Sequence, residues 1–264
     1  FKAENLVTKK TSVLKYQKNT KHQKQYDLLK SLELSEKNFL KLKKYAKKKK
    51  IEFLCTPFDI DGAYFLKKLG LKIFKIPSGE INNYPLLELF SKIGKKIILS
   101  TGMSTLNEIK YAIKILTKSK LKKKDITVLH CTTQYPANLK NVNLLAMQTI
   151  KRKLKISVGY SDHTETDLTS IIATVLGAEL IEKHITLSKK MLGPDHKASM
   201  EIKDFKNFVK NIKQVETILG KGIKAPTKDE KKYKHLIRKS IIAKKRIIKG
   251  QKFSINNITT KRPE

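Results

Sequence analysis

Two histidines follow two neighbouring apolar runs of this 264-residue chain. His163 comes after the run at residues 156–158, and His184 lies at the end of the run at residues 179–185. The amphipathic segment 164–178 separates the runs, so the stretch reads as strand, helix, strand. A right-handed crossover places two such strands parallel, with their ends on one side. The ordinary alternative is that the two histidines are unrelated and that each bonds to a backbone carbonyl. Two imidazoles that face one space can instead hold a divalent metal ion and leave coordination positions open, and we favour this interpretation.

Further reactive side chains stand where the other predicted strands end. Lys75 offers a point charge for a phosphate or carboxylate, and Glu80 is a candidate general base. Asp162 could orient His163 or bind a sugar hydroxyl. The hydroxyl donors of the set are Thr56, Ser78, Ser100 and Thr133. Each residue has an ordinary alternative, such as an ion pair between Lys75 and Glu80. If these side chains surround one pocket, they predict a metal-assisted enzyme that acts on a phosphorylated anion.

Apolar runs and helical patterns alternate along the chain. Strands are predicted at residues 51–57, 73–76, 97–100, 126–131, 156–158 and 179–185. Helices are predicted at residues 25–32, 35–49, 59–69, 84–93, 105–117, 142–151, 164–178 and 201–219. Continuous apolar strands are buried on both faces, which indicates an α/β fold with a parallel sheet. Polar residues at every strand end favour a (β/α)8 TIM barrel over an open doubly wound sheet, which would usually carry a glycine-rich fingerprint.

The predicted domains follow from this count. Six strands are two short of eight, so we expect the first two barrel strands to lie before Phe1. The barrel domain is predicted over residues 1–219 and a linker over residues 220–238. Residues 239–264, with short apolar runs around Gly250, are expected to begin a small β-rich domain.

The net charge of +35 invites a nucleic-acid interpretation. We expect no specific nucleic-acid binding, because the basic residues are nearly all lysines spread along every predicted helix, whereas base readout favours arginine. No apolar run approaches the roughly 18 residues of a membrane span, so no membrane contact is predicted. Cys55 and Cys131 lack the spacing of a metal site, which is typical of a reduced, cytoplasmic protein.

Six ordered motifs carry a family resemblance. They are KIPSGE at residues 75–80, STGM at 100–103, HCTTQYP at 130–136, GYSDHT at 159–164, EKH at 182–184 and GPDHKAS at 193–199. Together they resemble the sialic acid synthase family, and the last motif is similar to its N-acetylneuraminate and legionaminate branch. Residues 239–263 resemble the opening of the family's C-terminal antifreeze-like domain. The chain is therefore identified as a piece of such a synthase, truncated at both ends.

The resemblance implies a reaction. Such enzymes condense phosphoenolpyruvate with an open-chain N-acetylated hexosamine, here N-acetylmannosamine, to give a nine-carbon ulosonic acid and phosphate. A diacetamido-dideoxy hexose, used in legionaminate synthesis, is the alternative substrate. His163 and His184 would hold Mn²⁺ or Mg²⁺, which polarises the sugar aldehyde for attack by C3 of phosphoenolpyruvate. Water would then add at C2, and phosphate would leave from the same carbon. Glu80 would transfer protons to or from the water or the sugar hydroxyl.

The resemblance also implies binding roles. Phosphate and carboxylate would be held by Lys75, Ser78 and Ser100, with Thr56 and Thr133. Tyr135, Ser161 and Asp195 would line the site. In the full-length protein, Arg262 would reach the sugar's acyl group in the partner subunit of a domain-swapped homodimer. A non-catalytic sugar- or polyanion-binding fragment is the alternative from a different class.

Overall fold

The computed structural model describes residues 1–13, 22–193 and 195–264, so Pro194 of the GPDHKAS motif lies outside the described residues. The chain divides into two compact units, Phe1–Ile218 and Leu219–Glu264. In the described part of the chain, no helix has both the length and the apolar character needed to cross a membrane.

The first unit is built on a five-stranded parallel sheet. Its strands are β1 (Ile73–Ile76), β2 (Lys96–Ser100), β3 (Ile126–Cys131), β4 (Ser157–Asp162) and β5 (Ile181–Lys183). They lie side by side in chain order, as repeated βα units produce. The outermost strands still approach each other, because Lys75 Nζ of β1 lies 3.4 Å from Glu182 Oε2 of β5. The sheet is therefore curled into a half-barrel, and its strand ends surround one interior.

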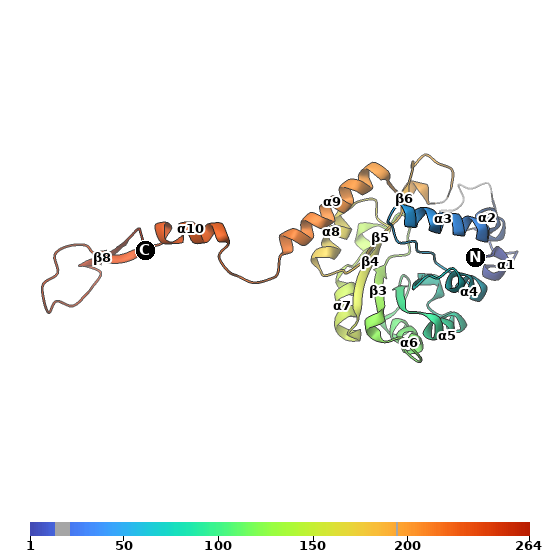
Figure 1. The fold of residues 1–264 in the computed structure, drawn as a ribbon, viewed down its shortest axis with the longest axis horizontal. Coiled ribbons are helices and arrows are strands. Elements are labelled where there is room, and N and C mark those ends of the chain that lie inside the picture. The colour runs from blue at the N-terminus through green and yellow to red at the C-terminus, as the bar shows by residue number, and fades with distance from the viewer. Residues whose placement is uncertain (14–21, 194) are drawn as a thin grey trace. The chain divides into compact units, whose positions relative to one another are not determined.

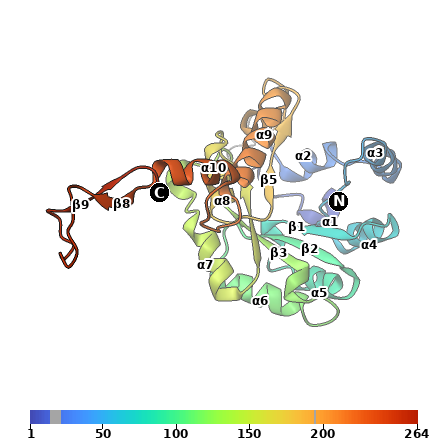
Figure 2. The same cartoon turned by 60° about the vertical axis from the view of Figure 1, so that its left-hand side comes forward.

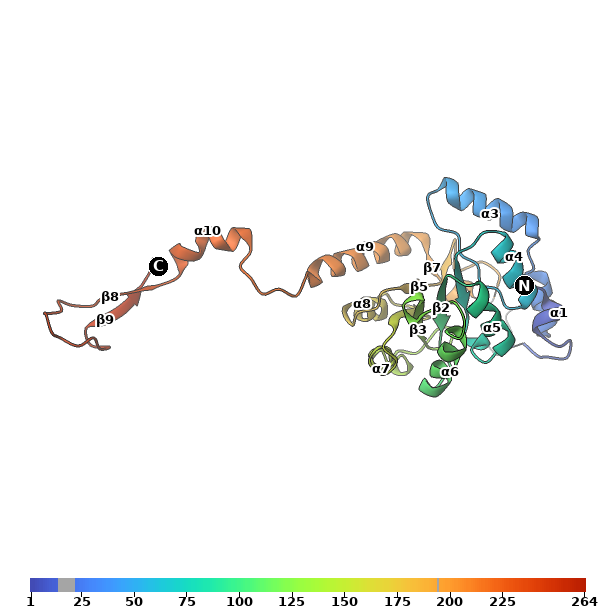
Figure 3. The same cartoon turned by 60° about the horizontal axis from the view of Figure 1, so that its bottom comes forward.

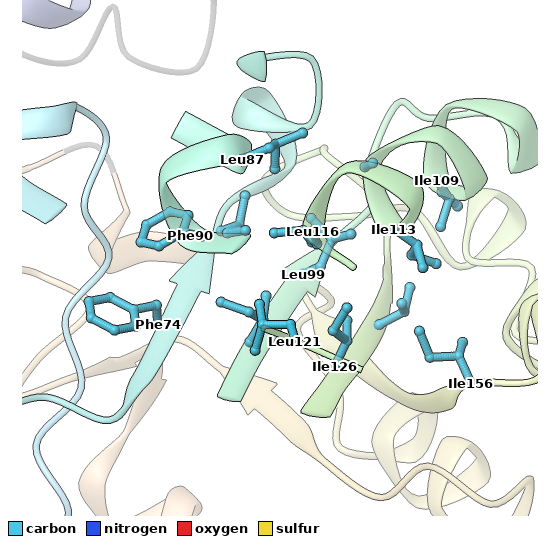
Figure 4. Packing of buried hydrophobic residues seen from close by; sticks show 14 of the residues in the cluster. Phe74, Leu87, Phe90, Leu99, Ile109, Ile113, Leu116, Leu121, Ile126 and Ile156 are labelled. Atoms are coloured by element: carbon cyan, nitrogen blue, oxygen red, sulfur yellow. The ribbon is translucent and has the colours of Figure 1, made fainter. Parts of the chain in front are cut away.

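Helices cover the outer face of this curl. They are α4 (Ile60–Lys68), α5 (Tyr84–Ile93), α6 (Leu106–Leu116), α7 (Leu145–Leu154) and α8 (Leu168–Val175), and Figures 1 and 2 show them around the strands. The core lies between the two layers, where Phe74 of β1 packs on Phe90 of α5 with ring centroids 5.2 Å apart (Figure 4). The capping box of Thr105 and Glu108 starts α6, as its sequence predicts.

Among the described residues, three helices precede α4, namely α1 (Ala3–Leu6), α2 (Gln25–Ser31) and α3 (Glu36–Lys48). Helix α3 lies within its predicted range, and the Ser35 hydroxyl caps it by accepting a bond from the backbone amide of Asn38. Figure 3 shows α3 beside α4, where the rings of Phe39 and Phe65 lie 5.9 Å apart. Short 3-10 turns lie at Ser78–Glu80, Lys123–Asp125, Leu139–Asn141 and His196–Ala198.

Two predicted strands differ from the structure. Residues 51–57 form no strand, because no described backbone hydrogen bond joins residues 52–57 to β1 and a strand exists only through such a ladder. The run at 179–185 is divided: β5 belongs to the main sheet, whereas β6 (Ile185–Thr186) pairs in parallel with β7 (Met200–Glu201). Helix α9 (Ile202–Leu219) follows β7, close to its predicted bounds.

The second unit contains a helix and a hairpin. Helix α10 (Lys228–Ile237) lies within the predicted linker 220–238, and Thr227 with Glu230 forms its capping box. Strands β8 (Ser240–Ala243) and β9 (Ile258–Lys261) pair antiparallel within the region expected to begin a β-rich domain.

Candidate active site

Alternation along the strands separates core residues from site residues. Successive side chains of a strand point to opposite faces of the sheet. Phe74, Leu99 and Tyr160 point outward into the helix-covered core. Their strand neighbours Lys75 and Ser161 point into the interior, where both contact Glu182. The interior near the strand ends is therefore polar, whereas the outer face of the same strands is apolar.

The structure brings the two predicted metal ligands together. His163 follows β4 and His184 follows β5, and their ring centroids are 5.4 Å apart. The Tyr135 ring, after β3, lies 4.2 Å from the ring of His163 and 5.6 Å from that of His184. Backbone bonds hold both histidines, since the carbonyl of His163 accepts from Ala137 N at 2.8 Å and that of His184 from Met200 N at 2.9 Å.

The surroundings of His163 select the form that binds metals. Its Nδ1 lies 2.8 Å from the carbonyl oxygen of Thr132. Because a carbonyl only accepts, Nδ1 carries the proton and Nε2 keeps its lone pair. Burial lowers the pKa of His163 below its ordinary value of 6.5, so the ring is neutral near pH 7.

The donor set around the histidines is small. Within the described ranges, no group of three or more His, Cys, Asp or Glu side chains could hold a metal ion. Cys131 Sγ lies 3.7 Å from His163 Nδ1, which is the nitrogen that bonds to the Thr132 carbonyl and not the one left free for a metal ion. The two imidazoles are thus the available protein ligands, and the remaining positions would be open to water or substrate.

Ser78, Ser100 and Thr133 gather near the ends of β1, β2 and β3. The Gly102 amide donates to Ser78 Oγ at 2.9 Å, and a methyl group at Gly102 would collide with Thr133 Oγ1. Ser100 Oγ is buried, and in the described part of the chain no hydrogen-bond partner reaches it. Since buried hydroxyls are normally paired, Ser100 has unused capacity for a bound molecule.

Lys75 pairs with Glu182 and not with Glu80. Its Nζ lies 3.4 Å from Glu182 Oε2, and the Lys75 side chain is 11% exposed. The other oxygen of Glu182 accepts from Ser161 Oγ at 2.7 Å. The Glu80 carboxylate accepts from the side-chain nitrogen Nδ2 of Asn83 at 2.7 Å. Sequence reasoning gave Glu182 no role in the site, although its position two residues before His184 on an alternating strand indicates the same face.

Asp162 lies elsewhere than predicted. Its carboxylate points to the outer face, is 0% exposed, and lies 3.0 Å from Lys183 Nζ. It can neither orient His163 directly nor meet a sugar in the interior, because adjacent strand residues face opposite ways. We therefore leave Asp162 out of the substrate-binding set.

Three further predicted residues are not joined to the histidine pair by any described contact. Thr56 lies in the segment that forms no strand, Asp195 directly precedes the turn His196–Ala198, and Arg262 belongs to the second unit. A cavity of about 760 Å³ lies beside α6 and α7, and its lining includes Cys131 and Thr133 at the end of β3. Polar side chains such as Thr101, Gln134 and Asn143 also line it, whereas His163, His184 and Lys75 do not.

Comparison with known proteins identifies the family. The sequence pattern of the NeuB family matches residues 1–224. The chain belongs to the NeuB family. It is 49% identical over 265 residues to the N,N'-diacetyllegionaminic acid synthase of Campylobacter jejuni, a match that covers 100% of this chain and 79% of that protein. The protein of the same name from Legionella pneumophila is 41% identical over 267 residues, covering 100% of this chain and 75% of the relative.

A solved structure supports the same assignment. The N-acetylneuraminic acid synthetase from Leptospira borgpetersenii, in complex with citrate, matches with a TM-score of 0.73 and 38% identity, over 78% of this chain and 72% of that one. The resemblance carried by the six motifs is thus confirmed. Relatives that make legionaminic and neuraminic acids support an enzyme of the sialic acid synthase type for this NeuB chain.

Proposed function

We propose that this NeuB protein condenses phosphoenolpyruvate with an open-chain N-acetylated hexosamine to give a nine-carbon ulosonic acid and phosphate. One observation carries the proposal. An imidazole pair, a lysine and a buried serine hydroxyl that finds no hydrogen-bond partner among the described residues share the interior of one curled sheet. The half-barrel supports the (β/α)8 architecture, in which the ends of several strands build one site.

The chain's own residues would divide the work. Lys75, Ser78 and Ser100, with Thr133, would bind the phosphate and carboxylate of phosphoenolpyruvate. Glu80 would take a proton from the water that adds at C2, and the phosphate would then leave. Ser161 reaches the same interior through its bond to Glu182, which supports a contact to substrate.

His163 and His184 would hold a divalent ion, with Nε2 of His163 directed to it. A bound ion would supply Lewis acidity at the sugar aldehyde. Because imidazole ligands suit Mn²⁺ better than Mg²⁺, which prefers oxygen ligands, we put Mn²⁺ first.

The sugar is proposed from the relatives. Both relatives named N,N'-diacetyllegionaminic acid synthase match the full chain, so we place a diacetamido-dideoxy hexose ahead of N-acetylmannosamine. Tyr135 packs against both histidines and would line the sugar site. Asp195 and, from a partner subunit of a swapped dimer, Arg262 stay predicted sugar contacts. A cytoplasmic location also stays a prediction.

The test is phosphate release by the full-length protein with phosphoenolpyruvate and each of the two sugars. We expect release with Mn²⁺, more with the diacetamido sugar, and none after chelation. His163→Ala and His184→Ala should abolish release while retaining the fold. A folded protein that binds sugar or polyanion without releasing phosphate would instead support the non-catalytic alternative.

A further inference from the structure

A buried ion pair lies on the outer face of the sheet, immediately before each histidine of the site. Lys183 Nζ and Asp162 Oδ2 are 3.0 Å apart, and the two side chains are 3% and 0% exposed. The two residues are also direct register partners of β4 and β5. Each is followed in the chain by a histidine, His163 or His184.

The carboxylate of Asp162 is fully hydrogen-bonded. One oxygen accepts from the Thr164 amide and from the Thr164 hydroxyl, both at 2.8 Å. The other accepts from Thr169 Oγ1 at 2.9 Å and from Ser170 Oγ at 2.6 Å. Although burial alone would raise the pKa of Asp162, Lys183 and these donors hold it below its ordinary value. Asp162 therefore connects β4 to the first turn of α8.

Lys183 connects β5 to the loop that follows His163. Its Nζ donates to the carbonyls of Thr164 at 2.6 Å and Thr166 at 3.1 Å, besides contacting Asp162. An ammonium group has three donors, and these three oxygens match them. A buried charge is tolerated only with such full pairing, which makes the arrangement specific for one geometry.

We propose that Asp162 and Lys183 are a positioning pair that sets the register of β4 against β5 and so places His163 beside His184. A slip of one residue between neighbouring strands turns every side chain to the other face. With the pair held on the outer face, the next residue of each chain segment must face the interior. The proposal rests on the proposed metal site, but the placement of the rings is measurable without metal.

The experiment compares Asp162→Asn, Lys183→Met and the double variant in the full-length protein. The double variant removes both buried charges, so it keeps the test open if a single variant leaves an unpaired charge and fails to fold. The matched control is Ser157→Ala. It removes the 2.7 Å bond to Glu179, which joins the same two chain segments at their opposite end.

Two readouts separate positioning from folding. The first is the set of histidine ring NMR signals of the metal-free protein, because His163 and His184 feel the ring currents of each other and of Tyr135. The second is Mn²⁺ affinity, measured from the free-ion EPR signal. We expect moved signals for both histidines, an unmoved signal for His235 of the second unit, and Mn²⁺ binding weakened about 10- to 100-fold. The control should match the wild type.

Folded pair variants with wild-type ring signals and wild-type Mn²⁺ affinity would overturn the positioning proposal. Equal effects in Ser157→Ala would also overturn it, because any loosening of β4 against β5 would then suffice. If the wild type binds no Mn²⁺, the metal site of the proposed function fails, and the ring signals alone decide the positioning.

Discussion

Replacing Glu182 by glutamine should strengthen anion binding in the interior. The Lys75 ammonium lies 3.4 Å from Glu182 Oε2. A phosphate that binds Lys75 must compete with this carboxylate. Glutamine keeps the size of the side chain and can still accept the bond from Ser161, which now goes to Oε1 at 2.7 Å. The substitution therefore removes the negative charge and places an amide nitrogen, which cannot accept a hydrogen bond, beside Lys75.

The geometry sets the size of the effect. Two unit charges at this distance attract by about 5 kcal/mol at an effective dielectric constant of about 20, which is an upper bound. The Glu182 side chain is 39% exposed, so solvent screening reduces the attraction. This ion pair is intermediate between an exposed pair and a buried one, so we take about 1–2 kcal/mol as its net attraction. Because 1.4 kcal/mol is a factor of ten, we expect about 5- to 30-fold tighter binding.

The assay is calorimetric titration of inorganic phosphate and of phosphoenolpyruvate into wild type and Glu182→Gln at low ionic strength. The gain should shrink as salt is added. The control is Glu179→Gln, which removes a carboxylate that bonds to Ser157 at the other end of the strands. Binding that is unchanged or weaker in Glu182→Gln would show that Glu182 supports the lysine for its ligand and does not compete for it.

Three further predictions use single positions. Ser100→Ala should leave the protein without phosphate at least as stable as the wild type, because an unpaired buried hydroxyl costs about 1–3 kcal/mol. The same substitution should weaken phosphate binding. Thermal unfolding with and without phosphate tests this, and a clear loss of stability without phosphate would refute it. Gly159→Ala should destabilise by about 1–3 kcal/mol in urea unfolding, because its methyl group would collide with the Leu180 carbonyl oxygen; an unchanged midpoint would contradict the close approach. Burial lowers the pKa of His130 below 6.5, so the unfolded chain binds the proton more tightly and stability should fall as pH drops below about 6.5. His130→Gln should flatten that fall below about pH 6.5, and an equally steep fall would exclude His130 as its source.

Much of the fold could be read from local sequence, because local rules decide it. The capping box at Thr105 and the serine cap of α3 act over one helical turn, and both are present. The order β1 to β5 follows from short βα units, which place consecutive strands in parallel contact. The same rule brought His163 and His184 together, since they end consecutive strands.

The alternation of side chains along a strand also predicts on which face of the sheet Asp162 lies. A strand residue next to His163 must face the opposite side, so the two cannot both reach the interior. The sequence contained this information. Because Ser161, Asp162 and His163 are consecutive in one motif, however, all three are predicted in the same site. The outward ion pair with Lys183 shows the consequence.

Other features depended on the tertiary structure, because they join segments far apart in the chain. Residues 51–57 are apolar enough for a strand, but a strand needs a hydrogen-bonded neighbour, and β1 provides none. The contact of Lys75 with Glu182 exists because the sheet curls until these side chains of its outermost strands reach each other across the interior. The sequence by itself determined which residues reach the strand ends, whereas the curvature of the sheet decided which of them touch.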